Sequence, residues 1–248
     1  MDVRIYKINT GITGRNFSSD KRTNFPIGGK TNSFYSIGNL MRGIEDFYLE
    51  GNLYFIDKEE ELEKFYNPLG DRWVAKKKYY ISHSKKEREN YLLEASKFHE
   101  YIVREQLEEI ANYLHHELNI NSLKIEVEEG NDFSFYTNIA IDEMNLNDEG
   151  KVELKGDKTL EIKWSENVNS QNEFLWIEDF EGLVNKVQEL KASNKRGEKE
   201  GLEENSLSKG ETSYILEIDN SFGISEKIGK KIGVNPTWLK KCSFKIIF

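Results

Sequence analysis

The feature that most constrains this chain is a long segment of helical periodicity, residues 84–119. Its apolar side chains recur every three or four residues in two stripes. The stripes are Leu92, Val103, Leu107, Ile110, Leu114 and Leu118, and Tyr91, Ala95, Phe98 and Ile102. Ser84 and Glu87 have the spacing of a capping box, and Asn119 suits the end. Two apolar stripes require burial on two sides, which predicts a central helix.

Short alternating segments on both sides of this helix predict strands. The clearest pair is a hairpin of residues 151–155 and 159–164. An odd loop of three residues places Val152 and Leu154 on one face of this hairpin. The other face then carries Glu153 directly opposite Glu161. Further strands are predicted at 3–8, 53–56, 73–82, 123–127, 133–141, 214–218 and 244–248, and smaller helices at 37–51, 178–192 and 225–232.

This order of elements predicts an α+β fold. We expect a single domain over residues 1–248, in which a mixed or antiparallel sheet packs on the long central helix and smaller helices lie at the periphery. Residues 193–212 have almost no large apolar side chain and many Gly, Glu, Lys and Ser residues. That composition predicts a mobile loop.

Composition narrows the class of protein. Hydrophobic residues make up 37% of the 248 residues, enough for a core. No apolar run approaches about 20 residues, and the N-terminus lacks the apolar stretch of a signal peptide. The single cysteine, Cys242, cannot form an internal disulfide, which fits a reducing cytosol. The abundance of Lys, Asn, Ile and Glu is typical of low-GC bacterial or phage genes.

The net charge of −9 is unevenly distributed along the chain. Lys and Arg minus Asp and Glu give +5 for residues 1–43, −2 for 44–104, −17 for 105–223 and +5 for 224–248. Either the basic ends dock on the acidic middle of the same chain, or a basic end meets the phosphates of a partner.

One basic segment also contains neighbouring aromatic residues. Lys76, Lys77 and Lys78 directly precede Tyr79 and Tyr80. Basic and aromatic residues together can bind single-stranded nucleic acid. The alternative is an edge strand whose lysines protect it from pairing with other chains, and this is our expectation.

The second basic segment, residues 225–242, has spacing similar to a helix-turn-helix. Gly233 lies at the turn, and Leu239 and Cys242 would point inward from a second helix. Four lysines would then face phosphate, namely Lys230, Lys231, Lys240 and Lys241. The alternative is a helical turn that only closes the sheet.

The charged face of the hairpin suggests a second chemistry. Glu153, Glu161 and Lys163 lie on adjacent predicted strands. Their arrangement resembles that of metal-dependent nucleases of the PD-(D/E)xK class, which implies Mg²⁺ held by the acids and water activated by the lysine. The alternative is a solvated hairpin in which diagonal Glu and Lys pairs balance the charges without a metal.

The leading functional hypothesis is therefore a cytosolic, non-enzymatic binding or regulatory protein that contacts nucleic acid or a protein partner. The alternative is a Mg²⁺- or Mn²⁺-dependent nuclease. We expect no cofactor or metal outside that alternative, and no membrane contact. The sequence does not indicate the oligomeric state.

Overall fold

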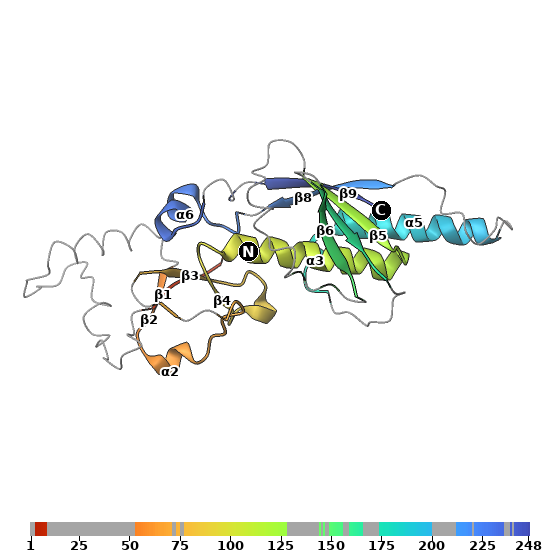
Figure 1. The fold of residues 1–248 in the computed structure, drawn as a ribbon. Coiled ribbons are helices and arrows are strands. Elements are labelled where there is room, and N and C mark those ends of the chain that lie inside the picture. The colour runs from red at the N-terminus through yellow and green to blue at the C-terminus, as the bar shows by residue number, and fades with distance from the viewer. Residues whose placement is uncertain are drawn as a thin grey trace, which may run out of the picture. The chain divides into compact units, whose positions relative to one another are not determined.

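The computed structural model describes residues 3–8, 53–70, 73–74, 77–127, 144, 146, 149–155, 159–165, 174–199, 212–219, 221–235, 239 and 241–248. The helix predicted at 37–51 and the strand predicted at 133–141 lie outside these residues. Helices are interspersed with strands along the chain, and the strands form two separate sheets (Figure 1). The predicted α+β class is thus confirmed.

The chain divides into two compact units, so the expected single domain stays a prediction. The first unit comprises Met1–His99 and Ser221–Leu239, and the second comprises Glu100–Asn220 and Lys240–Phe248. Within the described residues, no helix combines the length and the apolar character needed to cross a bilayer.

The first unit is built on a four-stranded mixed sheet with the order β2-β1-β3-β4. Its strands are β1 (Ile5–Ile8), β2 (Leu53–Ile56), β3 (Tyr79–Ser82) and β4 (Leu92–Glu94). β1 pairs parallel with β2 and antiparallel with β3, which in turn pairs antiparallel with β4. A short helix, α2 (Glu59–Leu62), follows β2. One core cluster contains Tyr6, Ile8, Ile56, Leu62, Tyr80 and Leu92, with Phe65 and Trp73 packed against it.

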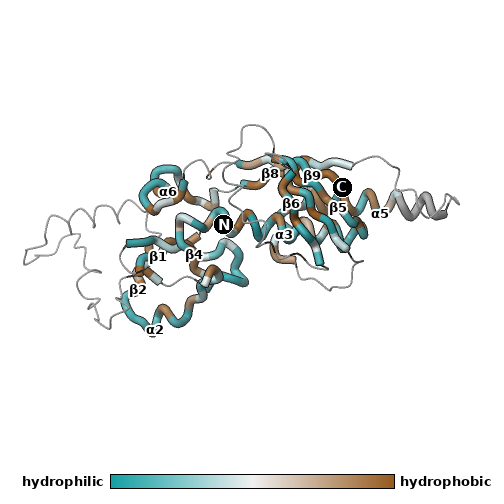
Figure 2. Tube along the Cα trace, viewed as in Figure 1, coloured by the Kyte–Doolittle hydropathy of each residue, from teal (hydrophilic) through white to brown (hydrophobic). Residues whose placement is uncertain are grey.

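The second unit is built on a five-stranded antiparallel sheet with the order β6-β7-β5-β9-β8. Its strands are β5 (Ser122–Val127), β6 (Lys151–Lys155), β7 (Thr159–Lys163), β8 (Ser213–Asp219) and β9 (Lys241–Ile247). Apolar and polar residues alternate along the strands, as Figure 2 shows. Leu123, Ile125, Ile162, Phe244 and Ile246 are fully buried on one face. The helices α3 (Phe98–Leu118) and α5 (Glu181–Lys199) lie along the sheet (Figure 1).

The predicted central helix exists, but it begins at Phe98 and not at Ser84. Its inward residues Val103, Leu107, Ile110 and Leu114 have no exposed surface, as the periodicity predicts. The preceding residues form a short 3-10 helix, η2 (Lys86–Arg88), and then β4. The reason is non-local, because β4 finds backbone partners in β3 that a helix could not use.

The predicted register of the hairpin is confirmed, although its second strand ends at Lys163, one residue before the predicted end. Glu153 pairs with Glu161, Lys151 with Lys163 and Val152 with Ile162. The helix predicted at 178–192 starts at Glu181 and extends to Lys199. The expected loop is therefore helical up to that residue, and residues 200–211 lie outside the described part of the chain.

Candidate nucleic-acid interface

The charged face of the hairpin holds ion pairs between lysines and both carboxylates. Lys155 Nζ lies 2.9 Å from Glu153 Oε2 and 3.7 Å from Glu161 Oε2. Lys163 Nζ lies 3.3 Å from Glu161 Oε1. The hydrogen bond from Lys155 lowers the pKa of Glu153 and raises that of Lys155. Lysine ammonium groups therefore balance the two facing carboxylates.

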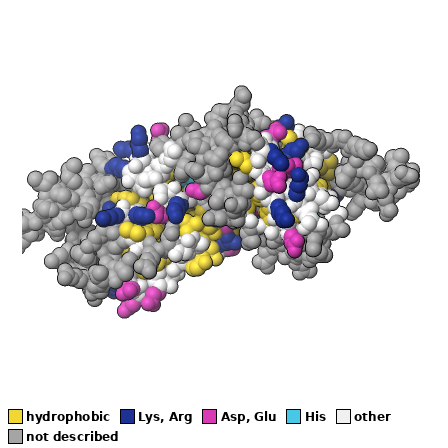
Figure 3. Space-filling view, viewed as in Figure 1, with side chains coloured by type: hydrophobic (Ala, Val, Ile, Leu, Met, Phe, Trp, Pro, Cys, Tyr) yellow, Lys and Arg dark blue, Asp and Glu magenta, His cyan; other side chains and the backbone are white. Residues whose placement is uncertain are grey.

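This geometry matches the solvated hairpin better than a metal site. Glu153 is exposed, and Figure 3 shows basic and acidic side chains interspersed over this part of the second unit. In the described residues no group of three or more His, Cys, Asp and Glu side chains could hold a metal ion. The catalytic role of Glu153, Glu161 and Lys163 stays a prediction.

Replacing Glu161 by Gln should change the free energy of unfolding by about 0.5 kcal/mol or less. The Glu161 side chain is 15% exposed, but both paired lysines are 55% exposed, so water screens the two ion pairs. Chemical denaturation of both proteins measures this change. We also expect no shift of the melting temperature on addition of Mn²⁺. Mn²⁺-dependent cleavage of plasmid by the wild type, lost in Glu161→Gln, would instead support the nuclease.

The four lysines predicted to face phosphate do not share one element. Lys230 and Lys231 lie in the last turn of α6 (Glu226–Ile232), in the first unit. Lys241 is the first residue of β9, in the second unit, and Lys240 lies outside the described residues. The prediction of a second helix that reaches Cys242 is wrong, because this residue is buried in β9 and pairs with Ile218.

The turn itself forms as predicted. Ser225 caps α6 by accepting a hydrogen bond from Ile228 N, and Gly233 ends the helix with a φ of 88°, a left-handed conformation that favours glycine. A Cβ at Gly229 would lie 2.6 Å from Leu239 Cδ1, so the end of this leucine side chain would have to shift to admit a larger residue. Within the described residues, the segment resembles a helix-turn-helix in its first helix and turn.

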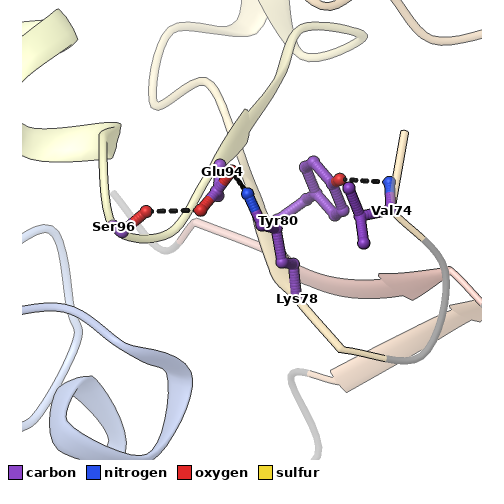
Figure 4. Close-up of polar contacts among 5 residues, drawn as sticks. All are labelled: Val74, Lys78, Tyr80, Glu94 and Ser96. Atoms are coloured by element: carbon purple, nitrogen blue, oxygen red, sulfur yellow. Dashed lines mark hydrogen bonds and ion pairs between the residues drawn. The ribbon is translucent and has the colours of Figure 1, made fainter. Parts of the chain in front are cut away.

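The lysines before β3 and the two tyrosines at the start of this strand form no exposed aromatic surface. Tyr79 and Tyr80 are 8% and 1% exposed. Tyr80 Oη accepts a hydrogen bond from Val74 N, and Lys78 Nζ pairs with Glu94, which also accepts from Ser96 (Figure 4). The expected edge strand is wrong as well, because β3 lies between β1 and β4. Its partners come from distant segments of the chain.

Exposed tyrosines occur elsewhere on the first unit, each beside a second aromatic ring. Tyr54, on β2, is 44% exposed, and its ring centroid lies 5.4 Å from that of Tyr6. Tyr66 is 53% exposed and lies 5.0 Å from Tyr91. Tyr66 also extends the sheet, because it forms a parallel bridge with Tyr91 next to β4. Backbone pairing thus positions the main chain of both exposed tyrosines.

A guanidinium group accompanies each of these ring pairs. Arg4 Cζ lies 5.9 Å from the ring centroid of Tyr54, and Arg88 Cζ lies 5.6 Å from that of Tyr91. A hydrogen bond with Tyr6 raises the pKa of Arg4. Guanidinium groups lie over aromatic rings in many folded proteins, and Arg104 over Tyr101 in the second unit is a further example. Arginine is also the side chain of choice for phosphate and nucleic-acid recognition.

We name Arg4, Tyr54, Tyr66, Arg88 and Tyr91 the Tyr/Arg cluster. Because side chains alternate along paired strands, Tyr54 lies on one face of the sheet, whereas Tyr66 and Tyr91 lie on the opposite face. The sequence analysis missed it, because its members come from separate segments and each looks ordinary alone. The sequence contains one signal, because Arg88 and Tyr91 are three residues apart. This spacing also fits the helix predicted at residues 84–119, so it did not indicate a separate site.

The uneven charge of the chain follows the division into units. The first unit carries 20 Lys and Arg against 15 Asp and Glu, a net charge of +5. The second carries 15 against 29, a net charge of −14. The Tyr/Arg cluster therefore lies on the basic unit.

Comparisons with known proteins give no functional analogy for this chain. The chain matches no family model, and searches of curated proteins and of solved structures give no significant match. Function must therefore be argued from the residues themselves.

Proposed function

We propose that this chain is a nucleic-acid-binding protein and that its first unit makes the contact. The observation that carries the proposal is the Tyr/Arg cluster on a unit of net charge +5, within a chain of net charge −9. Charge concentrated on one unit attracts a polyanion locally. The strongly negative second unit would repel the same polyanion and so restrict it to the first.

Arginines are the groups we expect to contact phosphate. Arg4 and Arg88 each present a delocalised charge beside an aromatic ring, which suits a phosphate next to a base or sugar. Glu89 lies near enough to Arg4 to affect its ionisation, so the local charge is not purely positive. Lys230 and Lys231 belong to the same unit and add to its charge.

Salt dependence tests this proposal. For about three phosphate contacts, affinity should fall about 20-fold for single strands and about 40-fold for duplex DNA between about 50 and about 200 mM salt, because bound counterions are released. Replacing Arg88 with Gln should weaken binding and reduce the slope of log K against log salt by about 0.7 to 0.9. Fluorescence anisotropy with labelled DNA and RNA measures both quantities.

A matched double variant separates the two basic surfaces of the first unit. Lys230→Gln with Lys231→Gln removes two charges, so a smaller effect than that of Arg88→Gln supports contact at the Tyr/Arg cluster. A larger effect would favour the α6 lysines predicted from the sequence. Failure of the wild type to bind any DNA or RNA at low salt would refute the proposal.

A further inference from the structure

The two edge strands of the five-stranded sheet differ in charge. In the described part of the chain this sheet ends in β6 on one side and in β8 on the other. β6 exposes Lys151, Glu153 and Lys155, and lysines on an edge strand oppose its pairing with another chain. β8 has no lysine among its seven residues, and its Ile215 is 50% exposed. β8 therefore lacks the protection that β6 has.

The hydrogen bonds beside β8 show which of its backbone groups point away from the sheet. Thr212 and Phe248 exchange two backbone hydrogen bonds of 3.0 Å, in register with the pairing of β8 and β9. Hydrogen-bonded pairs alternate along an antiparallel ladder, so every second residue counted from Thr212 also directs its N–H and C=O groups at β9. The residues between them, Ser213, Ile215 and Glu217, direct these groups outward. They can pair with a further strand.

The side chains of β8 define what such a strand would meet. The buried face of β8 packs on α5, where the hydroxyl of Tyr214 lies against Gly182. On the other face Ile215 and Glu217 are exposed. They are two residues apart, a distance of about 7 Å along the strand. An added strand therefore lies beside one apolar and one acidic side chain on this face.

We propose that β8 binds an extended, basic segment of a partner protein as an added strand. A Lys or Arg of that segment faces Glu217, and an apolar residue faces Ile215. In this mode of recognition, backbone hydrogen bonds at the sheet edge provide affinity and alternate side chains provide specificity. The inference goes beyond the proposed nucleic-acid binding, because it concerns the second unit and another class of partner.

Charge favours a basic partner over a second copy of this chain. The second unit has a net charge of −14, so two copies joined at β8 would bring two strongly acidic units together. A basic segment is attracted by the same charge. β9 shows how such a strand fits, because its Lys241 faces Asp219 on β8. Glu217 faces Ser243, so β9 places no lysine directly opposite this carboxylate.

The test uses a fluorescent peptide of sequence Lys-Val-Lys-Val-Val-Thr-Thr. Antiparallel to β8, its second lysine faces Glu217 and its third valine faces Ile215. We expect the full chain to bind it with a Kd below about 1 mM at about 0.15 M salt, measured by fluorescence anisotropy. A peptide with glutamate in place of both lysines should not bind. N-methylation of the second lysine and third valine removes the N–H groups that would face β8 and should also abolish binding.

Hydrogen exchange followed by NMR locates the bound peptide. In the free chain the amides of Ile215 and Glu217 should exchange quickly and that of Leu216 slowly, because only the last points at β9. The peptide at about ten times its Kd should slow exchange at Ile215 and Glu217 by about 10-fold.

Variants of the two edge strands keep the test specific. Glu217→Lys should weaken binding by at least about 10-fold, because it replaces an attraction by a repulsion. Ile215→Pro removes one outward N–H and no bond to β9, so it should weaken binding and leave the chain folded. Glu153→Lys makes the same charge change on β6 and should stay within about twofold of the wild type, since salt screens distant charges. Melting temperatures confirm that each variant is folded.

The other outcomes would overturn the proposal. Slow exchange of the Ile215 and Glu217 amides in the free chain at every concentration would mean that this edge is already paired within the chain. Slow exchange that is lost on dilution would indicate a second copy instead. Absence of peptide binding, or binding that survives N-methylation or Glu217→Lys, would also refute the added strand. None of these results bears on nucleic-acid binding by the first unit.

Discussion

Replacing Glu109 with Ala is expected to lower the free energy of unfolding by about 3 kcal/mol. The carboxylate of Glu109, on α3, accepts hydrogen bonds from two backbone amides, those of Trp176 and Ile177, the second at 2.8 Å. Both residues are buried, with 2% and 7% of their surface exposed. Alanine would leave the two N–H groups without this acceptor, and each charge-assisted bond contributes about 1.5 to 3 kcal/mol.

The same turn of α3 fixes the indole of Trp176. Glu105, four residues before Glu109, accepts a hydrogen bond of 2.8 Å from Trp176 Nε1. The two carboxylates thus attach Trp176 and the start of η4 (Ile177–Asp179) to the helix. Loss of Glu109 should therefore loosen the packing of a large aromatic residue as well as remove two bonds.

Chemical denaturation and tryptophan fluorescence measure the effect. Glu109→Gln keeps an acceptor oxygen but removes the charge, so we expect a smaller loss of about 1 to 2 kcal/mol. Glu108→Ala is the matched control, because the i,i+4 pair of its carboxylate with Arg104, at 3.6 Å, contributes about 0.5 kcal/mol. Equal stabilities of Glu109→Ala and Glu108→Ala would contradict the assigned role.

Local sequence patterns predicted the elements whose partners are close in the chain. The register of the hairpin followed from strand alternation and loop parity, because shifting one strand by a single residue would move Val152 and Leu154 to the other face. The cap of α6 at Ser225 and its end at Gly233 are likewise local features. Such features need no knowledge of the rest of the fold.

The start of the central helix depended on non-local contacts and was missed. Tyr91, Leu92 and Ala95 fit a helical stripe by chance, but Leu92 pairs with Ser82 and Ala95 N bonds to Tyr79 O. Apolar periodicity over three or four turns cannot distinguish these two uses of the same residues. Residues 92–94 form a strand because β3 is available to pair with them.

The Tyr/Arg cluster illustrates the same limit at the candidate site. Arg4 is part of the cluster because its backbone forms hydrogen bonds with Ser82, 78 residues away in the chain. Tyr66 belongs there because its backbone bonds to Asn90 and Leu92. Runs of lysine can be recognised in the sequence itself. The contacts between single arginines and tyrosines depend on the pairing of distant strands, so the sequence alone does not reveal them.

Acidification should destabilise the first unit through one buried histidine. His83 is 3% exposed, and its Nδ1 accepts a hydrogen bond of 3.1 Å from Lys85 N. Burial lowers its pKa from 6.5 to about 4, and the charges of Arg88 and Lys85 contribute in the same direction, while Glu87 opposes them. His83 is therefore neutral in the folded chain at pH 7 and adjoins the ring of Tyr91, at 6.3 Å between centroids.

The sign of the effect follows from the two protonation states. Below about pH 6.5 the unfolded chain binds a proton at His83 that the folded chain does not accept until about pH 4. Stability is thus unaffected above pH 6.5 and falls as the pH decreases through this window. The full difference corresponds to about 3 kcal/mol at and below pH 4.

The variant His83→Asn tests this prediction, because its side-chain oxygen can accept from Lys85 N but cannot gain a proton in this range. We expect the wild type to lose stability relative to His83→Asn by about 3 kcal/mol between pH 7 and pH 4 in denaturant titrations. Carboxylates such as Glu94, whose pKa the Lys78 hydrogen bond lowers against the opposing effect of burial, are present in both proteins and cancel in the comparison. A difference between the two proteins that stays constant across this range would mean that His83 gains its proton equally readily in the folded and unfolded chain.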